Sequence, residues 1–457
     1  MTKERWAPAI PAEASPKYIA LADAIERAVE AGELKPGDRL PTNRELSQLF
    51  NVTIATVTKG MAVAARKGLI TAQVGNGTFI AEGSAPQPEV EILDLSLNVV
   101  PQTVVSRELT TLLDTLNTNA VNDGLFGYGS YTPSIIHAQL ASAWMQSFGV
   151  DPLDGRILLT TGVHQGLLAS FFTLLKPGDP VICEELTYTG IKRIASFRDA
   201  RLLGAPCDHE GIVPEQLERQ LKSTQAKVVI LTPTLHNPTT ASMSLERRRA
   251  IAKLCQKYDA YLVEDGVNMP LAGGDHPPIA SFIPARAIFL TGYSKCVASG
   301  FRLGYAIVPP DLQSAFLEGL VGMQWTGPHL YSKLAENMLR EGFIEQFTLA
   351  HRAEASARYQ LARQLLRNVR PSEKPAYHAW VDCDTRNAAE NFAIQALRRG
   401  VKISPAAHFA VAGDGRTASN GYRISLGSCP DRLALERALA ALGTIDENRT
   451  PASSTLI

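Results

Sequence analysis

The chain has 457 residues, 45% of them hydrophobic and 20% charged, which predicts a globular protein of two or three folded units and argues against a disordered one. Lysine plus arginine equals aspartate plus glutamate, at 45 each, so any surface that attracts nucleic acid must be a local one. No run of about 18 apolar residues, no charged-then-apolar leader and no metal-like cysteine spacing occurs, which predicts a cytoplasmic protein without a membrane partner or a metal site.

The first predicted elements are three helices and a hairpin. Apolar residues within 16–30 keep helical spacing, and Thr42-Asn43-Arg44-Glu45 has the form of a capping box that starts a second helix. A third helix is expected over about 53–67. Short strands over 69–73 and 78–81 then flank glycines that suit a tight hairpin. This order is typical of a winged helix, although a small helical cap with a hairpin would share it.

The third helix should have one buried face and one partly accessible face, because its apolar residues recur at helical spacing. The buried face is predicted to hold Val57, Met61 and Ala64. The partly accessible face is predicted to hold Ile54, Thr56, Lys59 and Gly60. In helix-turn-helix proteins the second helix of the pair enters the major groove, while the helix before it and the wing contact phosphates.

The segments LPTNREL, VTIATVTKGM, GLI and GNGTFI resemble the GntR family of bacterial regulators. The resemblance implies that residues 1–82 form a winged helix-turn-helix domain, of α+β class, whose partner is double-stranded promoter DNA. The DNA-contacting residues that it implies, including the tip of the wing, are Arg44, Thr53, Thr56, Lys59, Gly75 and Gly77. The family commonly has arginine where this chain has Ile54, a residue that could still meet a thymine methyl group.

A segment rich in proline, glycine and polar residues predicts a linker over 83–92. After it, apolar bursts alternate with helical patterns, which predicts a mostly parallel sheet covered by helices on both faces. The bursts are RILLTT, PVICEE, KVVILTP, AYLVED and AIFLTGYS.

Beyond Pro310 the chain becomes chiefly helical and then has strands at 376–382 and 421–426 around a helix that ends near Gly400, as a smaller α/β subdomain would. We therefore expect an α/β domain over residues 93–457. Its large part is predicted over about 93–325 and its small part over about 326–445.

Polar residues follow the carboxyl ends of the predicted strands, where ligands bind in such sheets. They are Thr161-Gly162-Val163-His164-Gln165, His236-Asn237-Pro238-Thr239, Glu264-Asp265 and Ser294-Lys295. A glycine turn that opens a helix can hold a phosphate, but most such turns hold nothing, and each other residue has an ordinary structural role when taken alone. Their order along the chain is the evidence.

That order resembles fold-type-I aminotransferases, which use pyridoxal 5'-phosphate (PLP), from about residue 93 to the final helix. The resemblance implies that Lys295 forms a covalent imine with PLP and that Asp265 pairs with the pyridine nitrogen. Asn237 would donate a hydrogen bond to the ring's phenolic oxygen, and Tyr188 would lie against the ring face. The residues implied around the phosphate are Gly162, Val163, His164, Ser294 and Arg302, with Tyr128 reaching it from a partner subunit.

By the same resemblance Arg423, in GYRISLG, would grip a ligand carboxylate with its planar fork. Two departures bear on the mechanism. The family usually has a tyrosine two or three residues beyond the ring aspartate, where this chain has Val267 and Asn268, so the ring should be held less tightly. Three residues before Lys295, a phosphate-binding serine or threonine is common, whereas this chain has Gly292 with Thr291 beside it.

A GntR-type reader followed by an aminotransferase-like domain is the layout of the MocR subgroup of bacterial regulators. The resemblance implies a transcriptional regulator that holds PLP, responds to PLP itself or to a small amine or amino acid, and forms a head-to-tail homodimer. Two alternatives stay open. One is a working aminotransferase with a DNA-binding-like N-terminal domain, and the other is a repressor whose large domain is a dimerisation scaffold without cofactor.

Overall fold

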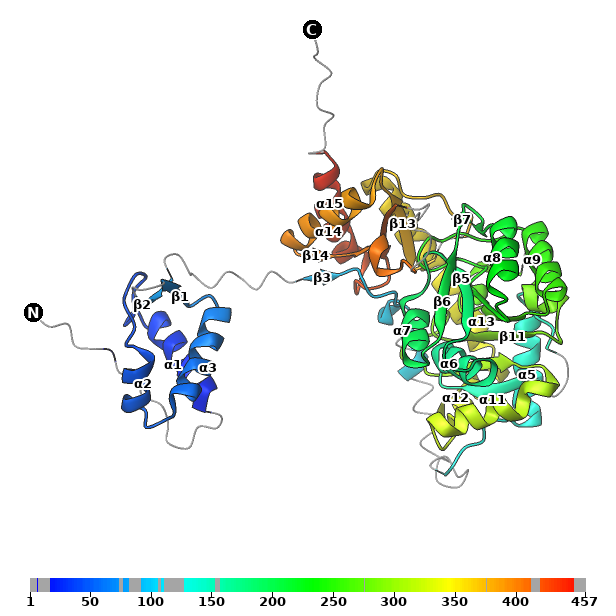
Figure 1. The fold of residues 1–457 in the computed structure, drawn as a ribbon, viewed down its shortest axis with the longest axis horizontal. Coiled ribbons are helices and arrows are strands. Elements are labelled where there is room, and N and C mark those ends of the chain that lie inside the picture. Colours follow the sequence, from blue (N-terminus) through cyan, green and yellow to red (C-terminus); the bar gives the residue numbers. More distant parts are fainter. Residues whose placement is uncertain are drawn as a thin grey trace, which may run out of the picture. The chain divides into compact units, whose positions relative to one another are not determined.

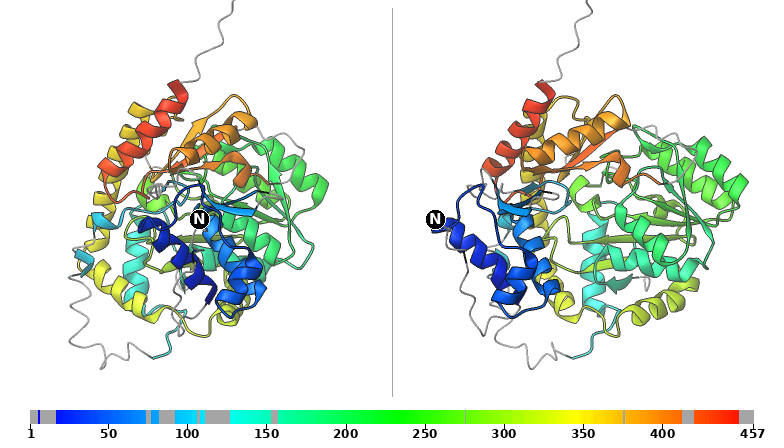
Figure 2. Two further views of the ribbon diagram at one scale, coloured as in Figure 1. Left: turned by 90° about the vertical axis from the view of Figure 1, so that its left-hand side faces the viewer. Right: turned by 60° about the vertical axis from the view of Figure 1, so that its left-hand side comes forward.

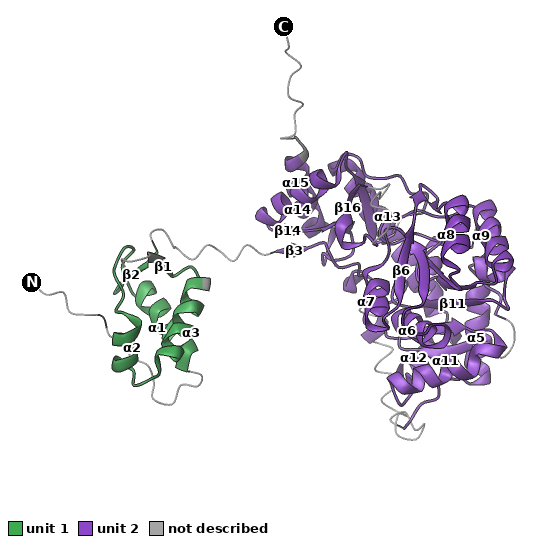
Figure 3. Cartoon of the chain, in the orientation of Figure 1, with its two compact units in different colours: residues 1–91 green, residues 92–457 purple. Residues whose placement is uncertain are grey.

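The computed structural model describes residues 6, 17–73, 77–81, 92–105, 108–110, 127–152, 157–274, 276–374, 376–411 and 420–447. The chain divides into two compact units, residues 1–91 and 92–457 (Figure 3). Of the predicted linker over 83–92, only Ile92 lies within the described residues. No helix in the described ranges is long and apolar enough to cross a membrane.

Within its described residues, the first unit contains three helices and a two-stranded sheet (Figure 1). They are α1 (Lys17–Glu30), α2 (Asn43–Leu49), α3 (Ile54–Arg66), β1 (Ile70–Gln73) and β2 (Gly77–Ile80). The strands pair antiparallel from Ile70 opposite Ile80 to Gln73 opposite Gly77, which gives the predicted wing. Its tip falls partly outside the described residues, because Gly75 is not among them.

The predicted capping box at the start of α2 is confirmed. The Glu45 amide donates to Thr42 Oγ1 (3.3 Å), and the Thr42 amide donates to Glu45 Oε2 (2.8 Å). Helix α3 begins in a related way, because its N-cap Thr53 accepts a hydrogen bond from the Thr56 amide at 3.2 Å. These local bonds satisfy amides that lack a partner in the first turn of a helix.

The core of the first unit lies between α1, α2 and α3, and it includes the predicted Val57, Met61 and Ala64. The prediction for Gly60 was wrong. Gly60 is buried, and a Cβ atom there would lie 2.8 Å from the Tyr18 carbonyl oxygen and 2.9 Å from Leu21 Cδ2 of α1. The glycine is therefore needed for close packing of α3 on α1 and does not belong to the accessible face.

The second unit is built on a seven-stranded sheet in the order β4-β12-β11-β10-β9-β5-β6. Figures 1 and 2 show this sheet with helices packed around it. All neighbouring strands are parallel except β12, which is antiparallel to both β11 and β4. The strands are β4 (Ile157–Thr160), β5 (Pro180–Glu184), β6 (Arg201–Ala205), β9 (Val228–Leu231), β10 (Tyr261–Asp265), β11 (Ala287–Gly292) and β12 (Gly304–Ile307). Strands β6 and β12 were not among the strands predicted from the sequence.

Helices cover both faces of this sheet, as predicted. Along β9, Val229 and Leu231 pack into one hydrophobic core, whereas Val228 and Ile230 pack into a second core on the opposite face. The helices around the sheet, with two short segments and one 3-10 turn, are α5 (Ile135–Gln146), α6 (Val163–Leu174), α7 (Thr189–Phe197), α8 (Pro214–Thr224), α9 (Leu245–Lys257), α10 (Met269–Ala272), η3 (Ile279–Phe282), α11 (Pro310–Met323), α12 (His329–Arg340), β7 (Cys207–Asp208) and β8 (Gly211–Ile212).

A smaller subdomain has its own core and a three-stranded antiparallel sheet in the order β13-β16-β15. A short parallel pair joins β3, which follows the predicted linker, to β14. Its elements are β3 (Leu93–Asp94), α13 (Phe343–Leu365), β13 (His378–Asp382), α14 (Arg386–Arg398), β14 (Val401–Lys402), β15 (Ser404–Pro405), η4 (Ala406–His408), β16 (Gly421–Ser425) and α15 (Arg432–Glu447). The 3-10 turn η1 (Gln102–Val104) packs against a core of the large sheet through Val104.

The packing divides the second unit differently from the predicted boundary between residues 325 and 326. Helix α12 and the start of α13 contribute Leu334 and Phe347 to a core of the large sheet, whereas Tyr359, later in α13, belongs to the core of the small subdomain. The crossing point therefore lies within α13. At the other end, Leu95 packs in the small subdomain although it was assigned to the large part.

Candidate functional site

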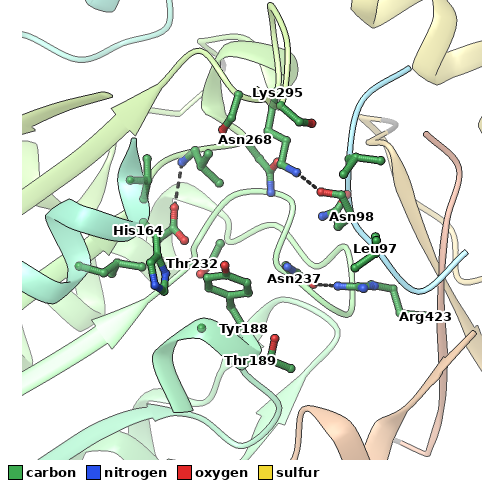
Figure 4. A pocket seen from close by; sticks show the side chains of 18 of the residues that line it. Leu97, Asn98, His164, Tyr188, Thr189, Thr232, Asn237, Asn268, Lys295 and Arg423 are labelled. Carbon is green, nitrogen blue, oxygen red and sulfur yellow. Dashed lines mark hydrogen bonds between the residues drawn. The ribbon is translucent and has the colours of Figure 1, made fainter. Parts of the chain in front are cut away.

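A cavity of about 530 Å³ lies where the carboxyl ends of the large sheet's strands face the small subdomain (Figure 4). Strands β10 and β11 bring Asp265 and Lys295 to it, the segment after β9 brings Asn237, and β16 of the small subdomain brings Arg423. Its lining also includes Ser96, Leu97, Asn98, Val163, His164, Tyr188, Arg193, Thr232, Val267, Asn268, Ser294, Ser299 and Arg302. The structure therefore gathers most of the residues predicted for cofactor binding in one place.

Lys295 is half-buried at the end of β11, and its Nζ donates a hydrogen bond to the backbone carbonyl of Asn98 at 2.5 Å (Figure 4). Burial, together with the positive charges of Arg423 and Arg302, lowers the pKa of Lys295 to about 8, although the charge of Asp265 acts in the opposite direction. A larger fraction of this amine than of an ordinary lysine is therefore neutral near pH 7. A neutral amine is the form that can attack a carbonyl carbon.

Asp265 is buried at the end of β10, and its Oδ1 accepts a hydrogen bond from the Val267 amide at 3.0 Å. Burial raises the pKa of Asp265 to about 6, while the Val267 amide and the charge of Lys295 favour the ionised form. The carboxylate is thus charged near pH 7. The neighbouring Glu264 has a structural contact instead, because it accepts from the Ala280 amide at 2.8 Å.

Arg423 is only 5% exposed, and it binds two parts of the protein. Its Nη1 donates to Asn237 Oδ1 at 2.8 Å, and its Nη2 donates to the backbone carbonyl of Ser96 (Figure 4 shows the bond to Asn237). Because Asn237 uses its oxygen for Arg423, its amide N–H groups remain the donors for a cofactor oxygen. Burial lowers the pKa of Arg423 to about 10, which keeps it charged near neutral pH.

The predicted phosphate end is formed by the start of α6 and by Arg302. Gly162 has φ of 88°, and a Cβ atom there would lie 2.4 Å from Arg302 Nη2, so the glycine allows the guanidinium to approach the helix N-terminus. Arg302 Nη2 donates to the Thr161 carbonyl at 3.1 Å. Amides at a helix start together with a guanidinium form a site that suits a phosphate. Val163, His164 and Ser294 line the cavity beside them.

The packing explains why glycine stands at position 292. A Cβ atom on Gly292 would lie 2.7 Å from the Leu303 carbonyl oxygen and 3.0 Å from the Gly304 Cα of β12, so no side chain fits. Thr291 does not replace the missing hydroxyl, because its Oγ1 is buried and donates to the Gly266 carbonyl at 3.3 Å. A phosphate bound at this end would therefore contact the residues around Gly162 and Arg302 instead.

The aromatic side of the cavity contains Tyr188 and His164, whose rings meet edge to face with centroids 6.2 Å apart. Burial lowers the pKa of His164, as do Arg302 and Arg193. At the position expected for a tyrosine, Asn268 is buried and donates from Nδ2 to the Leu235 carbonyl at 2.8 Å. Asn268 therefore stabilises the loop that contains Leu235.

Tyr128 does not line the cavity, and it is 85% exposed. Its role toward a partner subunit remains a proposal. Sequence reasoning did not identify Ser96, Asn98, Thr232 or Arg193, although all four line the cavity. The DLSLN segment contains no sequence signal that marks it, because its contacts with Lys295 and Arg423 use backbone carbonyl groups.

The first unit presents a candidate DNA-binding surface on α2 and α3. Arg44 and Lys59 are exposed, and no ion pair of either residue occurs within the described part of the chain. The Thr53 and Thr56 hydroxyl groups are 2.9 Å apart and form a hydrogen bond at the start of α3. Ile54, 49% exposed, lies beside them. A free basic side chain on each helix suits contact with phosphates.

Two family descriptions match the chain: "Bacterial regulatory proteins, gntR family" over residues 17–80, and "Aminotransferase class I and II" over residues 91–442. The HTH-type transcriptional regulator YdeF of Bacillus subtilis is 27% identical over 453 residues, which cover 97% of this chain and 94% of that protein. The vitamin B6 salvage pathway transcriptional repressor PtsJ of Salmonella typhimurium is 30% identical over 90% of this chain and 94% of its own length.

The solved structure of an archaeal alanine:glyoxylate aminotransferase has a TM-score of 0.71 to this chain at 22% identity, covering 79% of this chain and 92% of that one, and so shows the fold. The predicted fold class is thereby confirmed: an N-terminal helix-turn-helix domain followed by a fold-type-I domain of the kind that binds PLP. The chain belongs to the MocR subgroup of the GntR family of bacterial transcriptional regulators.

Proposed function

We propose that this regulator binds promoter DNA through α2 and α3 and that PLP, alone or with a small amine or amino acid, sets its affinity for that DNA. The observation that carries the proposal is the cavity at which Lys295, Asp265 and Arg423 converge. The same chain has exposed basic residues, Arg44 and Lys59, on the helices of its first unit. As a DNA-binding protein it would act in the cytoplasm.

Several groups around the cavity have a proposed task. The start of α6 and Arg302 would hold the phosphate, Asp265 would keep the ring nitrogen protonated, and the Asn237 amide would donate to the ring oxygen. When bound, PLP supplies an aldehyde carbon that the neutral amine of Lys295 can attack. Arg423 would take the carboxylate of an amino-acid effector. Because PtsJ is named as a repressor of the vitamin B6 salvage pathway, PLP itself is favoured as one effector.

We also propose that the protein forms a head-to-tail homodimer in which Tyr128 reaches the phosphate of the partner subunit. The Gly129 amide donates to Thr326 Oγ1 at 2.8 Å, which brings the loop of Tyr128 beside that of Trp325. Both aromatic side chains are largely exposed, at 85% and 76%. Exposed aromatic residues on adjacent loops are typical of an interaction surface.

A second candidate function is transamination, because Lys295, Asp265 and Arg423 are all in place. Asn268 argues against efficient turnover, since it contacts the Leu235 carbonyl where an aminotransferase usually has a tyrosine that steadies the ring oxygen.

One set of measurements tests both functions: the visible spectrum of the PLP-treated protein, its binding to promoter DNA from neighbouring genes, and turnover with amino donors and a keto acid. We expect a visible absorbance band of bound PLP, tighter binding to promoter DNA than to random duplex DNA, and at most slow turnover of the amino donors. Sustained turnover of about 1 per second or more would favour the enzyme. If promoter and random duplex bind equally at moderate salt, the regulator proposal fails.

The pH dependence of PLP capture should reflect the lowered pKa of Lys295. Only the neutral amine reacts, so the capture rate should rise with pH and level off above about 8. Arg423→Ala removes a positive charge that lowers the pKa of Lys295. The midpoint of the pH dependence of PLP capture should therefore move upward in this variant, toward the ordinary lysine pKa of 10.5. Arg193→Ala, which removes another cavity arginine, is the control and should leave the midpoint near 8. An unchanged midpoint in Arg423→Ala would contradict the assignment.

A further inference from the structure

Residues 96–98, here called the bridging segment, hold both side chains that a ligand would need. Lys295 Nζ donates to the Asn98 carbonyl, and Arg423 Nη2 donates to the Ser96 carbonyl. Figure 4 shows Asn98 and Leu97 on this segment, with Lys295 on one side and Arg423 on the other. Both contacts are charge-assisted hydrogen bonds to backbone oxygens, which are stronger than neutral ones.

The bridging segment follows closely on the DNA-binding unit in the sequence, since that unit ends at Glu91 and β3 begins at Leu93. Before the segment, the Leu95 amide donates to the Lys402 carbonyl at 2.8 Å. Within it, the Leu97 carbonyl accepts from Ser428 Oγ at 2.8 Å. These bonds tie the segment to the small subdomain, whereas the bond from Lys295 ties it to the end of β11 in the large sheet.

The side chain of Asn98 fixes the orientation of the segment. His378 Nε2 lies 3.0 Å from the His236 carbonyl, which only accepts, so the proton of His378 is on Nε2 and its Nδ1 accepts from Asn98 Nδ2 at 3.4 Å. Burial lowers the pKa of His378 to about 3, so this connection stays neutral at ordinary pH. Asn98 Oδ1 is left buried without a partner among the described residues.

A ligand that uses the same N–H groups breaks these contacts. When the Lys295 amine condenses with an aldehyde, a C=N bond forms, water leaves, and the nitrogen loses the N–H groups that it donates to Asn98. A carboxylate that accepts from the Nη2 N–H now bonded to the Ser96 carbonyl displaces that carbonyl. Each event removes one tie of the bridging segment and leaves the other.

We propose that the bridging segment carries the ligand state of the cavity to the DNA-binding unit: free Lys295 and free Arg423 hold it, and a ligand that engages either side chain releases it at that point. This inference rests on the proposed function, because it concerns how the cavity acts on DNA binding. It requires that each contact differ between the ligand-free and the ligand-bound state, as any coupling between two sites does.

The test uses the full-length protein with PLP as the probe and promoter DNA from the neighbouring genes. Hydrogen exchange of the peptide covering residues 92–100 should become faster when PLP is added. Lys295→Met, which keeps the length of the side chain but not its donor, should show fast exchange without PLP. Its DNA affinity without PLP should equal that of PLP-bound wild type within about twofold and should not respond to PLP, while PLP should shift the wild type about fivefold or more.

A second variant loosens the segment outside the cavity. Ser428→Ala removes the bond to the Leu97 carbonyl, so it should keep the visible PLP band but reduce the effect of PLP on DNA affinity at least about threefold. Ser223→Ala is the matched control, because the bond that its hydroxyl makes within the described residues is to the Gln220 carbonyl of its own helix, and it should behave as wild type.

The outcomes separate the two proposals. If wild type shows no PLP band or no preference for promoter DNA, the proposed function fails and this inference falls with it. If PLP binds and changes DNA affinity while exchange over 92–100 is unchanged, and ligand-free Lys295→Met binds DNA like ligand-free wild type, the bridging segment carries no signal and only this inference is overturned. If PLP binds without any effect on DNA affinity, the proposal that PLP alone sets this affinity fails, and this inference falls with it.

Discussion

Replacing Lys295 by alanine is expected to abolish the visible absorbance band of lysine-bound PLP completely. The amine of Lys295, with its pKa lowered to about 8, lines the cavity between Asp265 and Arg423. Without it no covalent bond can form, although some PLP should stay bound through the start of α6 and Arg302. Absorbance spectra after removal of excess PLP, with phosphate analysis of the retained fraction, measure both quantities.

Lys192→Ala is the matched control for this experiment. Burial also lowers the pKa of Lys192, but its Nζ donates to the His408 carbonyl at 2.9 Å and it does not line the cavity. This variant should keep the band. If the band survives in Lys295→Ala and disappears in Lys192→Ala, then Lys192 forms the covalent bond with PLP and the assignment to Lys295 is wrong.

The variant Arg423→Ala tests a separate prediction, which concerns how the effector's carboxylate is bound. The variant should retain the band, because Arg423 has no part in the covalent bond. A carboxylate-bearing amino acid should then lose its influence on DNA affinity, since removing two charge-assisted hydrogen bonds costs about 1.5–3 kcal/mol or more, or about tenfold or more in effector affinity. A carboxylate-free amine should act equally on wild type and variant. If both ligands act equally on both proteins, Arg423 does not read a carboxylate.

The sequence predicted features that depend on neighbouring residues. The Thr42 capping box and the start of α3 at Thr53 follow from side chains that bond within their own turn. The convergence of Asp265 and Lys295 was also predictable, because parallel strands end at the same edge of a sheet. For such features the residue types and their spacing suffice.

Features that depend on distant residues could not be predicted. Strand β12 has only four residues, and its antiparallel place between β11 and β4 is set by pairing with both. Gly60 was predicted on the partly accessible face of its helix. The reason for the error is that only the packing of α1 against Gly60 shows that a side chain there would collide. The bond from Lys295 to Asn98 joins residues 197 positions apart through a backbone carbonyl, which every residue type possesses.

Replacing Arg44 by alanine is expected to lower the affinity for promoter DNA by about tenfold or more, because one charge-assisted contact with a phosphate or base is lost and a dimer loses it twice. Arg44 is exposed in the first turn of α2, and the capping bonds of that helix belong to Thr42 and Glu45. Alanine favours helix, so the reader should stay folded and PLP binding should not change.

Binding measured over a series of salt concentrations provides the most direct check of this assignment. The slope of log affinity against log salt should fall by about one for each phosphate contact removed. Arg27→Ala is the control, because Arg27 is also an exposed arginine but lies in the last turn of α1, outside the helix-turn-helix pair. It should keep the affinity of wild type within about twofold. If Arg44→Ala and Arg27→Ala bind promoter DNA with the same affinity and the same salt slope, α2 does not contact DNA through Arg44, and the GntR-type docking geometry does not hold for this chain.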